Sequence, residues 1–121
     1  MNLTETLQNV GTFNDTERQA VAELAEALQT LPQVQGIFLF GDKLRDESAD
    51  ISLIVLVDIR SSQLLEQVVQ MVHDTEEQHQ CLITPEVFAT EVFVALVQSG
   101  SPRLQNFQRE AVVLYQRDEA G

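Results

Sequence analysis

Two apolar segments separated by a short polar loop constrain the fold of this chain more than any other feature. The first segment ends in Ile37–Phe40 and is followed at once by Gly41. The second, Ile51–Val57, is apolar at all but one position. Apolar runs of this length without polar alternation are typical of strands that are covered on both faces. The sequence therefore predicts two buried strands joined by a loop that begins with a tight glycine turn.

A helix is predicted before the first of these strands. Asn14 or Asp15 can cap it, and Thr16 with Gln19 has the spacing of a capping box. Apolar residues then recur every three or four positions as far as residue 31, which indicates one apolar stripe that packs against a core. Pro32 ends this helix.

The second half of the chain is expected to alternate helix and strand. After a helix capped by Ser61 or Ser62, a third strand is predicted at about 79–84. Thr84-Pro85-Glu86 combines a capping hydroxyl, a proline and a carboxylate in the first turn, which indicates a helix that runs to about Gln98. The remaining elements are a short helix opened by Pro102 and a last strand over Ala111–Tyr115.

This order of elements predicts an α/β domain with a mixed β-sheet flanked by helices. A chain of 121 residues suffices for one domain with its own core, so we expect a single domain over 1–121. Within it, residues 1–13 are expected to form a short helical arm that ends near Gly11, and residues 117–121 a frayed tail.

Composition and charge exclude several classes of function. The net charge of −12 would repel a nucleic-acid backbone, which argues against broad nucleic-acid binding. No apolar run approaches the roughly 20 residues of a membrane span. The N-terminal segment has no basic region or apolar core of a signal peptide. Cys81 is the only cysteine, which suits a reducing compartment. We therefore expect a cytoplasmic protein that does not bind membranes.

The segment from Ile37 to Val55 resembles the signature of the nucleotidyltransferase superfamily in its minimal one-domain type. In that signature an apolar strand leads into Gly-Ser, a basic turn and then Ser-Asp-hydrophobic-Asp-Leu. Here Gly41, Arg45, Ser48 and Asp50 stand at matching positions. The resemblance implies the same mixed α/β fold.

The end of the chain carries a second part of this resemblance. The segment from Ser99-Gly100-Ser101-Pro102 to Leu114-Tyr115 looks like the closing helix and apolar strand of minimal nucleotidyltransferases. The resemblance therefore covers most of the chain.

The resemblance also implies where the chemistry of such enzymes would be located. Their carboxylates hold Mg²⁺ ions, which neutralise a triphosphate and activate the attacking hydroxyl. Asp50 takes the first carboxylate position and is the candidate catalytic residue and metal ligand. Ser52 stands at the second position, and the third is expected near His79, where residues 78–84 contain no carboxylate. Asp42 replaces the phosphate-binding serine. The implied nucleotide-binding candidates are Gly41, Asp42, Lys43, Arg45, Ser48 and Ser52.

These departures favour a nucleotidyltransferase-fold protein that is catalytically degenerate and acts as a binding or regulatory subunit of a protein complex. The alternative is an active Mg²⁺-dependent nucleotidyltransferase that uses Asp50, for example to transfer AMP to a helical partner. Magnesium and a nucleoside triphosphate are its cofactors only in that case. A third hypothesis is a module that binds nucleotides at the glycine turn without turnover. A transition-metal site formed by Asp42, Asp50 and His79 is a further alternative.

Simpler structural roles for the same loop stay open. An aspartate after a glycine, such as Asp42, is an ordinary turn residue. Lys43 and Arg45 can pair with Asp46 and Glu47 in solvent, where ion pairs contribute little.

One segment points to a partner. Val92–Val97 is apolar on every side if it is helical, so it is either fully buried or contacts another chain; a strand is also open. Minimal nucleotidyltransferases commonly pair with a small helical protein of the HEPN type, some as antitoxin and toxin. The resemblance therefore implies a homo-oligomer or a partner of that type.

Overall fold

The computed structural model describes residues 3–44 and 46–117, and in it strands alternate with helices. The elements are α1 (Leu3–Gln8), α2 (Asp15–Gln29), β1 (Val34–Leu39), β2 (Ile51–Val57), α3 (Ser62–His79), β3 (Ile83–Ala89), α4 (Thr90–Gln98), α5 (Phe107–Glu110) and β4 (Val112–Gln116). Two 3₁₀ turns, Asp42–Leu44 and Pro102–Leu104, lie between them. The predicted α/β class with a mixed sheet flanked by helices is confirmed.

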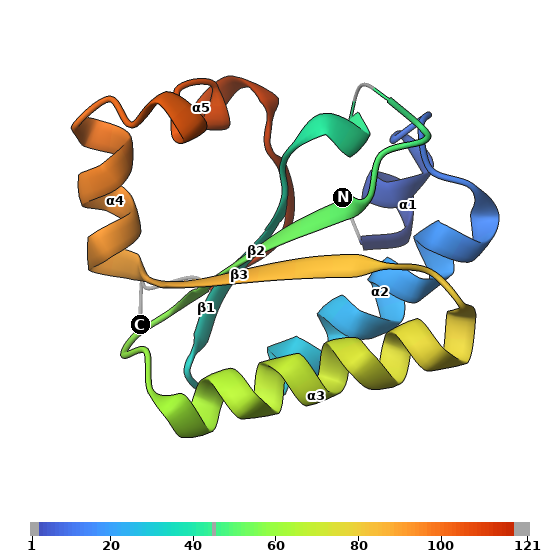
Figure 1. Ribbon diagram of the computed structural model, residues 1–121, viewed down its shortest axis with the longest axis horizontal. Helices are drawn as coiled ribbons and strands as arrows, with labels where there is room; N and C mark the ends of the chain where they lie inside the picture. The colour runs from blue at the N-terminus through green and yellow to red at the C-terminus, as the bar shows by residue number, and fades with distance from the viewer. Residues whose placement is uncertain (1–2, 45, 118–121) are drawn as a thin grey trace.

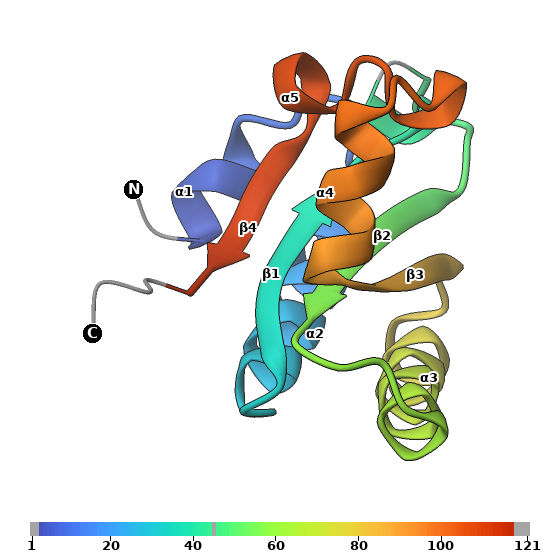
Figure 2. The ribbon, with the colours of Figure 1, turned by 90° about the vertical axis from the view of Figure 1, so that its left-hand side faces the viewer.

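The four strands form one sheet in the order β3-β2-β1-β4. β1 is antiparallel to both β2 and β4, whereas β3 runs parallel to β2. Helices α2 and α3 cover one face, and α4 with α5 lies on the other (Figures 1 and 2). Six of the seven residues of β2 are buried, as expected for a continuously apolar strand between two helical layers.

The sheet separates two apolar clusters. The larger cluster packs α2 and α3 against the sheet and includes Leu24, Val55 and Val68. The smaller one is aromatic: the ring of Phe107 lies 5.2 Å from that of Phe38 and 4.8 Å from that of Phe93, in edge-to-face geometry. Such contacts stabilise beyond the apolar area they bury. The aromatic cluster anchors α4 and α5 to the sheet.

The capping box of α2 lies two residues before the predicted one. The Asn14 side chain accepts the backbone N–H of Glu17, and Glu17 accepts that of Asn14. The prediction of Asn14 as a cap is confirmed, and the pairing of Thr16 with Gln19 is wrong. The box leaves the second oxygen of Glu17 available for the loop after β1.

The N-terminal arm is part of the core rather than a projection. Leu7, Val10 and Phe13 are buried in the larger cluster, and α1 lies beside β4 (Figure 2). Arg18 of α2 donates hydrogen bonds to the carbonyls of Leu7 and Val10, 3.1 and 3.0 Å away, and so satisfies backbone groups at the end of α1.

The predicted boundaries between residues 79 and 90 are wrong. Helix α3 continues to His79 and ends at Gln80, which adopts a left-handed conformation with φ of 54°. The third strand is therefore Ile83–Ala89 rather than 79–84, and Thr84-Pro85-Glu86 lies inside it instead of opening a helix. Pairing with β2 along seven residues outweighs the local capping signal. Pro85 is tolerated because β3 is an edge strand.

The start of the predicted frayed tail is held in place. The backbone N–H of Arg117 donates to the Gln35 carbonyl at 2.8 Å, and its Nε donates to the Tyr115 hydroxyl. Residues 118–121, the rest of that tail, lie outside the described part of the chain. None of the described helices is both long and apolar enough to cross a membrane.

Candidate functional site

The glycine turn after β1 packs directly against Ser52 of β2. Gly41 has a φ of 133°, which side chains disfavour, and a Cβ at this position would lie 3.3 Å from both Cβ and Oγ of Ser52. Two sequence-predicted residues thus meet. They border a cavity of about 370 Å³, lined by Phe40, Gly41, Ser52, Pro102, Arg103, Asn106 and Glu110.

A carboxylate on β3 lies on the same face of the sheet as Ser52. Ser52 is opposite Thr84 in the parallel register, and Ile54 is opposite Glu86. Side chains two residues apart on a strand share a face, so Glu86 lies on the side of Ser52. The alignment that put the third carboxylate position near His79 is therefore wrong, because His79 ends α3.

Sequence reasoning missed Glu86 because it assigned Thr84-Pro85-Glu86 to the start of a helix. The Val87-Phe88 pair that follows has high strand propensity and is a signal that the strand continues past Pro85.

Arg103 forms a salt bridge with the carboxylate of Glu86. The two guanidinium Nη atoms donate to the two carboxylate oxygens, one to each, which is the paired geometry that arginine favours. The side chain of Glu86 is 19% exposed and that of Arg103 is 65% exposed. The only cation that lines this cavity is therefore already paired with an acid, within the residues that the structure describes.

Other predicted residues line a second cavity. Lys43, Ser48 and Asp50 border a space of about 280 Å³, together with residues of the α2 start and the segment before β3. Asp50 is exposed and precedes the first residue of β2, Ile51. The structure therefore divides the predicted site, with Gly41 and Ser52 at one cavity and Lys43, Ser48 and Asp50 at the other.

Lys43 is buried although it belongs to a polar loop. Its side chain is 4% exposed, and its Nζ lies 2.8 Å from Oε2 of Glu17. The same amine donates to the Glu47 carbonyl and lies 5.5 Å from the centroid of the Phe13 ring. The alternative that Lys43 pairs in solvent is wrong, because the N-terminal segment covers it. Lys43 ties the loop to α2.

Two further groups near this second cavity have shifted pKa values. Ser48 donates to Asp46 from its hydroxyl, at 2.7 Å, and from its backbone, and these hydrogen bonds lower the pKa of Asp46. Burial raises the pKa of the Cys81 thiol, and the carboxylates of Glu17 and Glu76 raise it further. Both shifts follow from local contacts.

The remaining candidates do not join these groups. The side chain of Asp42 and the whole of Arg45 lie outside what the structure describes. His79, the proposed third ligand of a transition metal, pairs with Glu23 of α2 instead. In the described part of the chain, no three side chains of the His, Cys, Asp and Glu types gather to hold a metal ion.

The described donors do not fit magnesium. Mg²⁺ needs oxygen ligands in a near-octahedral arrangement, usually with one or two carboxylates. Ser52 offers a neutral hydroxyl, Glu86 is held by Arg103, and Asp50 lines the other cavity. Among the described residues, Glu110 is the one carboxylate that lines the Ser52 cavity, and a single carboxylate does not supply the pair that a two-metal site uses.

The chain was compared with family models, curated proteins and solved structures. No family model matches the chain, and no curated protein matches it in sequence. Among solved structures, the crystal structure of a candidate nucleotidyltransferase from Sulfolobus solfataricus is similar, with a TM-score of 0.46 and 11% sequence identity. The similarity covers 97% of this chain and 89% of that one.

Proposed function

We propose that this chain is a nucleotidyltransferase-like domain that does not transfer nucleotides and acts by binding, as a subunit of a protein complex. The observation that carries the proposal is the pairing of Arg103 with Glu86 beside Ser52. An arginine fixed on the β3 carboxylate neutralises the charge that would attract a divalent cation. A hydroxyl at position 52 supplies no charge to replace it.

The position of Asp50 supports the same proposal. Two carboxylates can share a metal pair only if both face one cavity, and Asp50 lines the cavity of Lys43 rather than that of Ser52. The loop that carries Asp50 is anchored by the buried pair of Lys43 with Glu17.

A second candidate function, Mg²⁺-dependent nucleotidyl transfer that uses Asp50, is favoured by Glu86. Glu86 of β3 lies on the same face of the sheet as Ser52, so neighbouring strands β2 and β3 can each contribute an acidic residue near this edge. Nucleotidyl transfer would require the Glu86 carboxylate to separate from Arg103, and this hypothesis predicts that Asp50→Asn abolishes transfer.

Labelled-nucleotide incorporation separates the two functions. The protein is incubated with each of the four common triphosphates and Mg²⁺ or Mn²⁺, and label is measured on the chain itself and in released products. We expect no incorporation above that of a heat-denatured sample. Reproducible incorporation that Asp50→Asn removes would refute the proposal and establish the alternative.

A gain-of-binding experiment tests the reason for the loss. The double variant Ser52→Asp with Arg103→Ala should bind Mn²⁺ at least about tenfold more tightly than the wild type by calorimetry, because it adds one carboxylate and frees another. The matched control, Ser62→Asp with Arg109→Ala, makes the same changes of charge at exposed positions and should leave the affinity unchanged. Tight Mn²⁺ binding by the wild type would contradict the geometry described above.

A further inference from the structure

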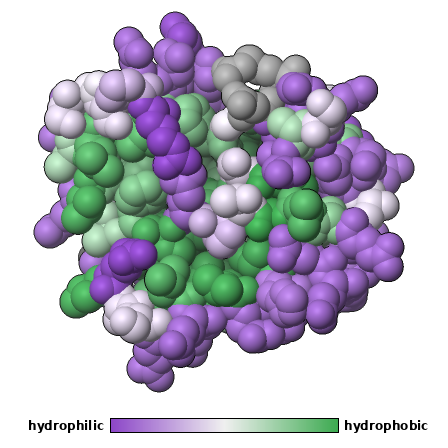
Figure 3. Space-filling model, viewed as in Figure 1, coloured by the Kyte–Doolittle hydropathy of each residue, from purple (hydrophilic) through white to green (hydrophobic). Residues whose placement is uncertain are grey.

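Three of the six large apolar side chains that are most exposed among the described residues belong to the α4 side of the sheet. Val92 and Val94 of α4 are 54% and 44% exposed, and Val113 of β4 is 47% exposed. Figure 3 shows apolar surface over α4 and hydrophilic surface along α3.

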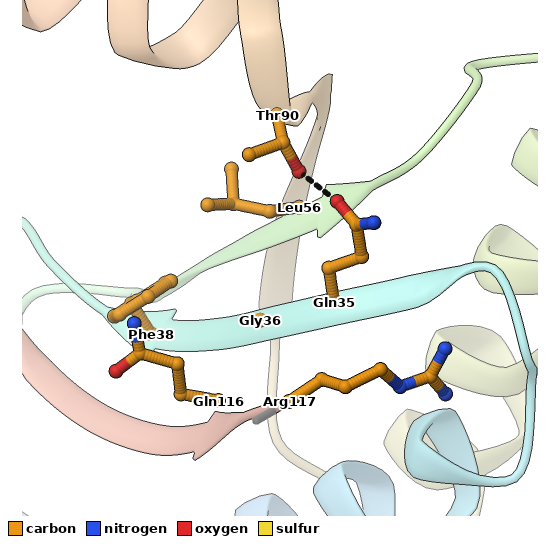
Figure 4. Close-up of a pocket in the computed structure, with 7 residues that line it drawn as sticks. All are labelled: Gln35, Gly36, Phe38, Leu56, Thr90, Gln116 and Arg117. Atoms are coloured by element: carbon orange, nitrogen blue, oxygen red, sulfur yellow. Dashed lines mark hydrogen bonds between the residues drawn. The ribbon is translucent and has the colours of Figure 1, made fainter. Parts of the chain in front are cut away.

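A trough lies next to this helix. It measures about 580 Å³ and is lined by Gln35, Gly36, Phe38, Leu56, Thr90, Gln116 and Arg117 (Figure 4). Its floor is Gly36, which stands between Leu56 of β2 and Gln116 of β4 in the sheet register. A Cβ on Gly36 would lie 2.8 Å from the Phe38 ring, so the missing side chain leaves room for that ring and opens the floor.

The trough, Val94 and Val113 lie on one side of α4 and of the sheet, whereas Val92 is on the opposite flank of the helix. Thr90 lines the trough, and Val94 lies four residues later on the same side of α4. Val113 is opposite Phe38 in the register of β4 with β1, so its side chain is on the trough side of the sheet. In Figure 2, β1 is visible between α4 and β4 along this face. A convex apolar helix therefore stands beside a concave surface.

The charge of the chain is distributed unevenly between its two faces. Helices α2 and α3 carry eight acidic residues and one arginine. The segment from β3 to Arg117 is balanced, with three residues of each sign: Glu86, Glu91, Glu110, Arg103, Arg109 and Arg117. Two copies that meet through the α4 face avoid the repulsion between the acidic helices, which then point away from each other.

Sheet edges are poorer attachment sites than this face. On β3, the side chain of Glu76 accepts the backbone N–H of Ile83 and Arg60 donates to the Val87 carbonyl, while Pro85 has no N–H to offer. These features block the addition of a strand. The outer side of β4 is next to α1 (Figure 2).

We propose that a second copy of this chain docks on the face formed by α4 and the trough, so that α4 of each copy seats in the trough of the other. A helix and a trough side by side on one surface are self-complementary, which is what a two-fold symmetric dimer requires. This inference rests on the proposed function, a binding subunit, and identifies its partner surface and partner.

Sedimentation velocity over a range of about 1–100 µM tests the dimer, because this range covers dissociation constants in the micromolar range. The wild type should sediment as a dimer at the upper concentrations. Val94→Asp should weaken dimerisation about 100-fold or more, because two symmetric copies each bury a charge. Leu82→Asp is the matched control: Leu82 is 67% exposed but belongs to the loop before β3, and its change should leave the dimer intact. Circular dichroism checks that both variants are folded.

Mixing variants tests the arrangement itself. Gln116→Trp fills the trough and should also give monomers. A mixture of Val94→Asp with Gln116→Trp should associate more tightly than either variant alone, because one of its two helix–trough contacts is then wild type on both sides, whereas neither contact is intact in the single-variant dimers. A monomeric wild type, a Leu82→Asp variant that dissociates equally, or a mixture that associates no more tightly than its two components alone would overturn the inference. The sedimentation experiments test only the dimer. The incorporation assay tests the proposed function independently, so the failure of one can be distinguished from the failure of the other.

Discussion

Removal of the Lys43 amine should destabilise the protein far more than removal of an exposed charge. Lys43→Met keeps the length of the side chain but leaves the Glu17 carboxylate, whose side chain is 15% exposed, without its cation. Breaking a buried ion pair costs about 3–5 kcal/mol. We expect a value near the lower limit, about 3 kcal/mol, because Glu17 keeps its hydrogen bond from Asn14.

Urea denaturation measures this loss directly. With a slope of about 2 kcal/mol per molar urea, a loss of about 3 kcal/mol lowers the midpoint by roughly 1.5 M. Arg109→Met, at an exposed position, is the matched control and should change stability by less than about 0.5 kcal/mol. The double variant Lys43→Met with Glu17→Gln should be more stable than the sum of the single changes predicts, by about 1–2 kcal/mol.

Two results would refute the reasoning on Lys43. A loss below about 1 kcal/mol would mean that the pair contributes no more than exposed ion pairs do. Additive effects of Lys43→Met and Glu17→Gln would mean that the two side chains do not interact. If Lys43 instead binds phosphate, Lys43→Met would abolish nucleotide binding in calorimetry while the urea midpoint stays unchanged.

Three other predictions follow from local contacts. Phe107→Ala removes the ring shared by the aromatic cluster and should cost about 3–5 kcal/mol of unfolding free energy in urea, whereas a loss under about 1 kcal/mol would show that the cluster is loosely packed. Asn14→Ala removes the α2 cap and should cost about 1–2 kcal/mol, and Asn14→Ser should recover most of it. Alkylation of Cys81 should rise with pH through a midpoint above that of an unstructured cysteine peptide, since burial raises the pKa of its thiol; a midpoint at or below that of the peptide contradicts the assigned burial. The same shift implies stability that is present below the unfolded thiol's pKa and is lost as pH rises through the folded value.

The sequence sufficed for elements whose pattern is long and local. Ile51–Val57 was predicted with its observed bounds because an uninterrupted apolar run has few alternatives. The prediction for residues 79–90 was wrong because a local capping signal was taken for the start of a helix. Thr84-Pro85 looks like a helix start, yet seven paired residues along β2 hold it extended, and that pairing is non-local.

The site was less predictable than the fold for the same reason. Lys43 belongs to a polar loop. Its amine is buried because Phe13, before α2, and Glu17, in the first turn of α2, pack against that loop in the folded chain. The place of Glu86 depends on the parallel register between β2 and β3, which no short motif encodes. The contiguous motif from Ile37 to Val55 predicted its two strands and the glycine turn correctly. It did not predict which of the two cavities each side chain lines.

The division of the motif between two cavities has an electrostatic consequence. A triphosphate beside Gly41 would meet Arg103, but this guanidinium already pairs with both oxygens of Glu86. The Lys43 amine, which belongs to the loop after Gly41, is buried against Glu17. Each cation is thus compensated by an acid, so a phosphate could gain attraction only by exposing a carboxylate to like charge, at about 4 kcal/mol per contact at 4 Å for an effective dielectric near 20. Binding of a neutral or apolar surface, such as the one that α4 presents, carries no such cost.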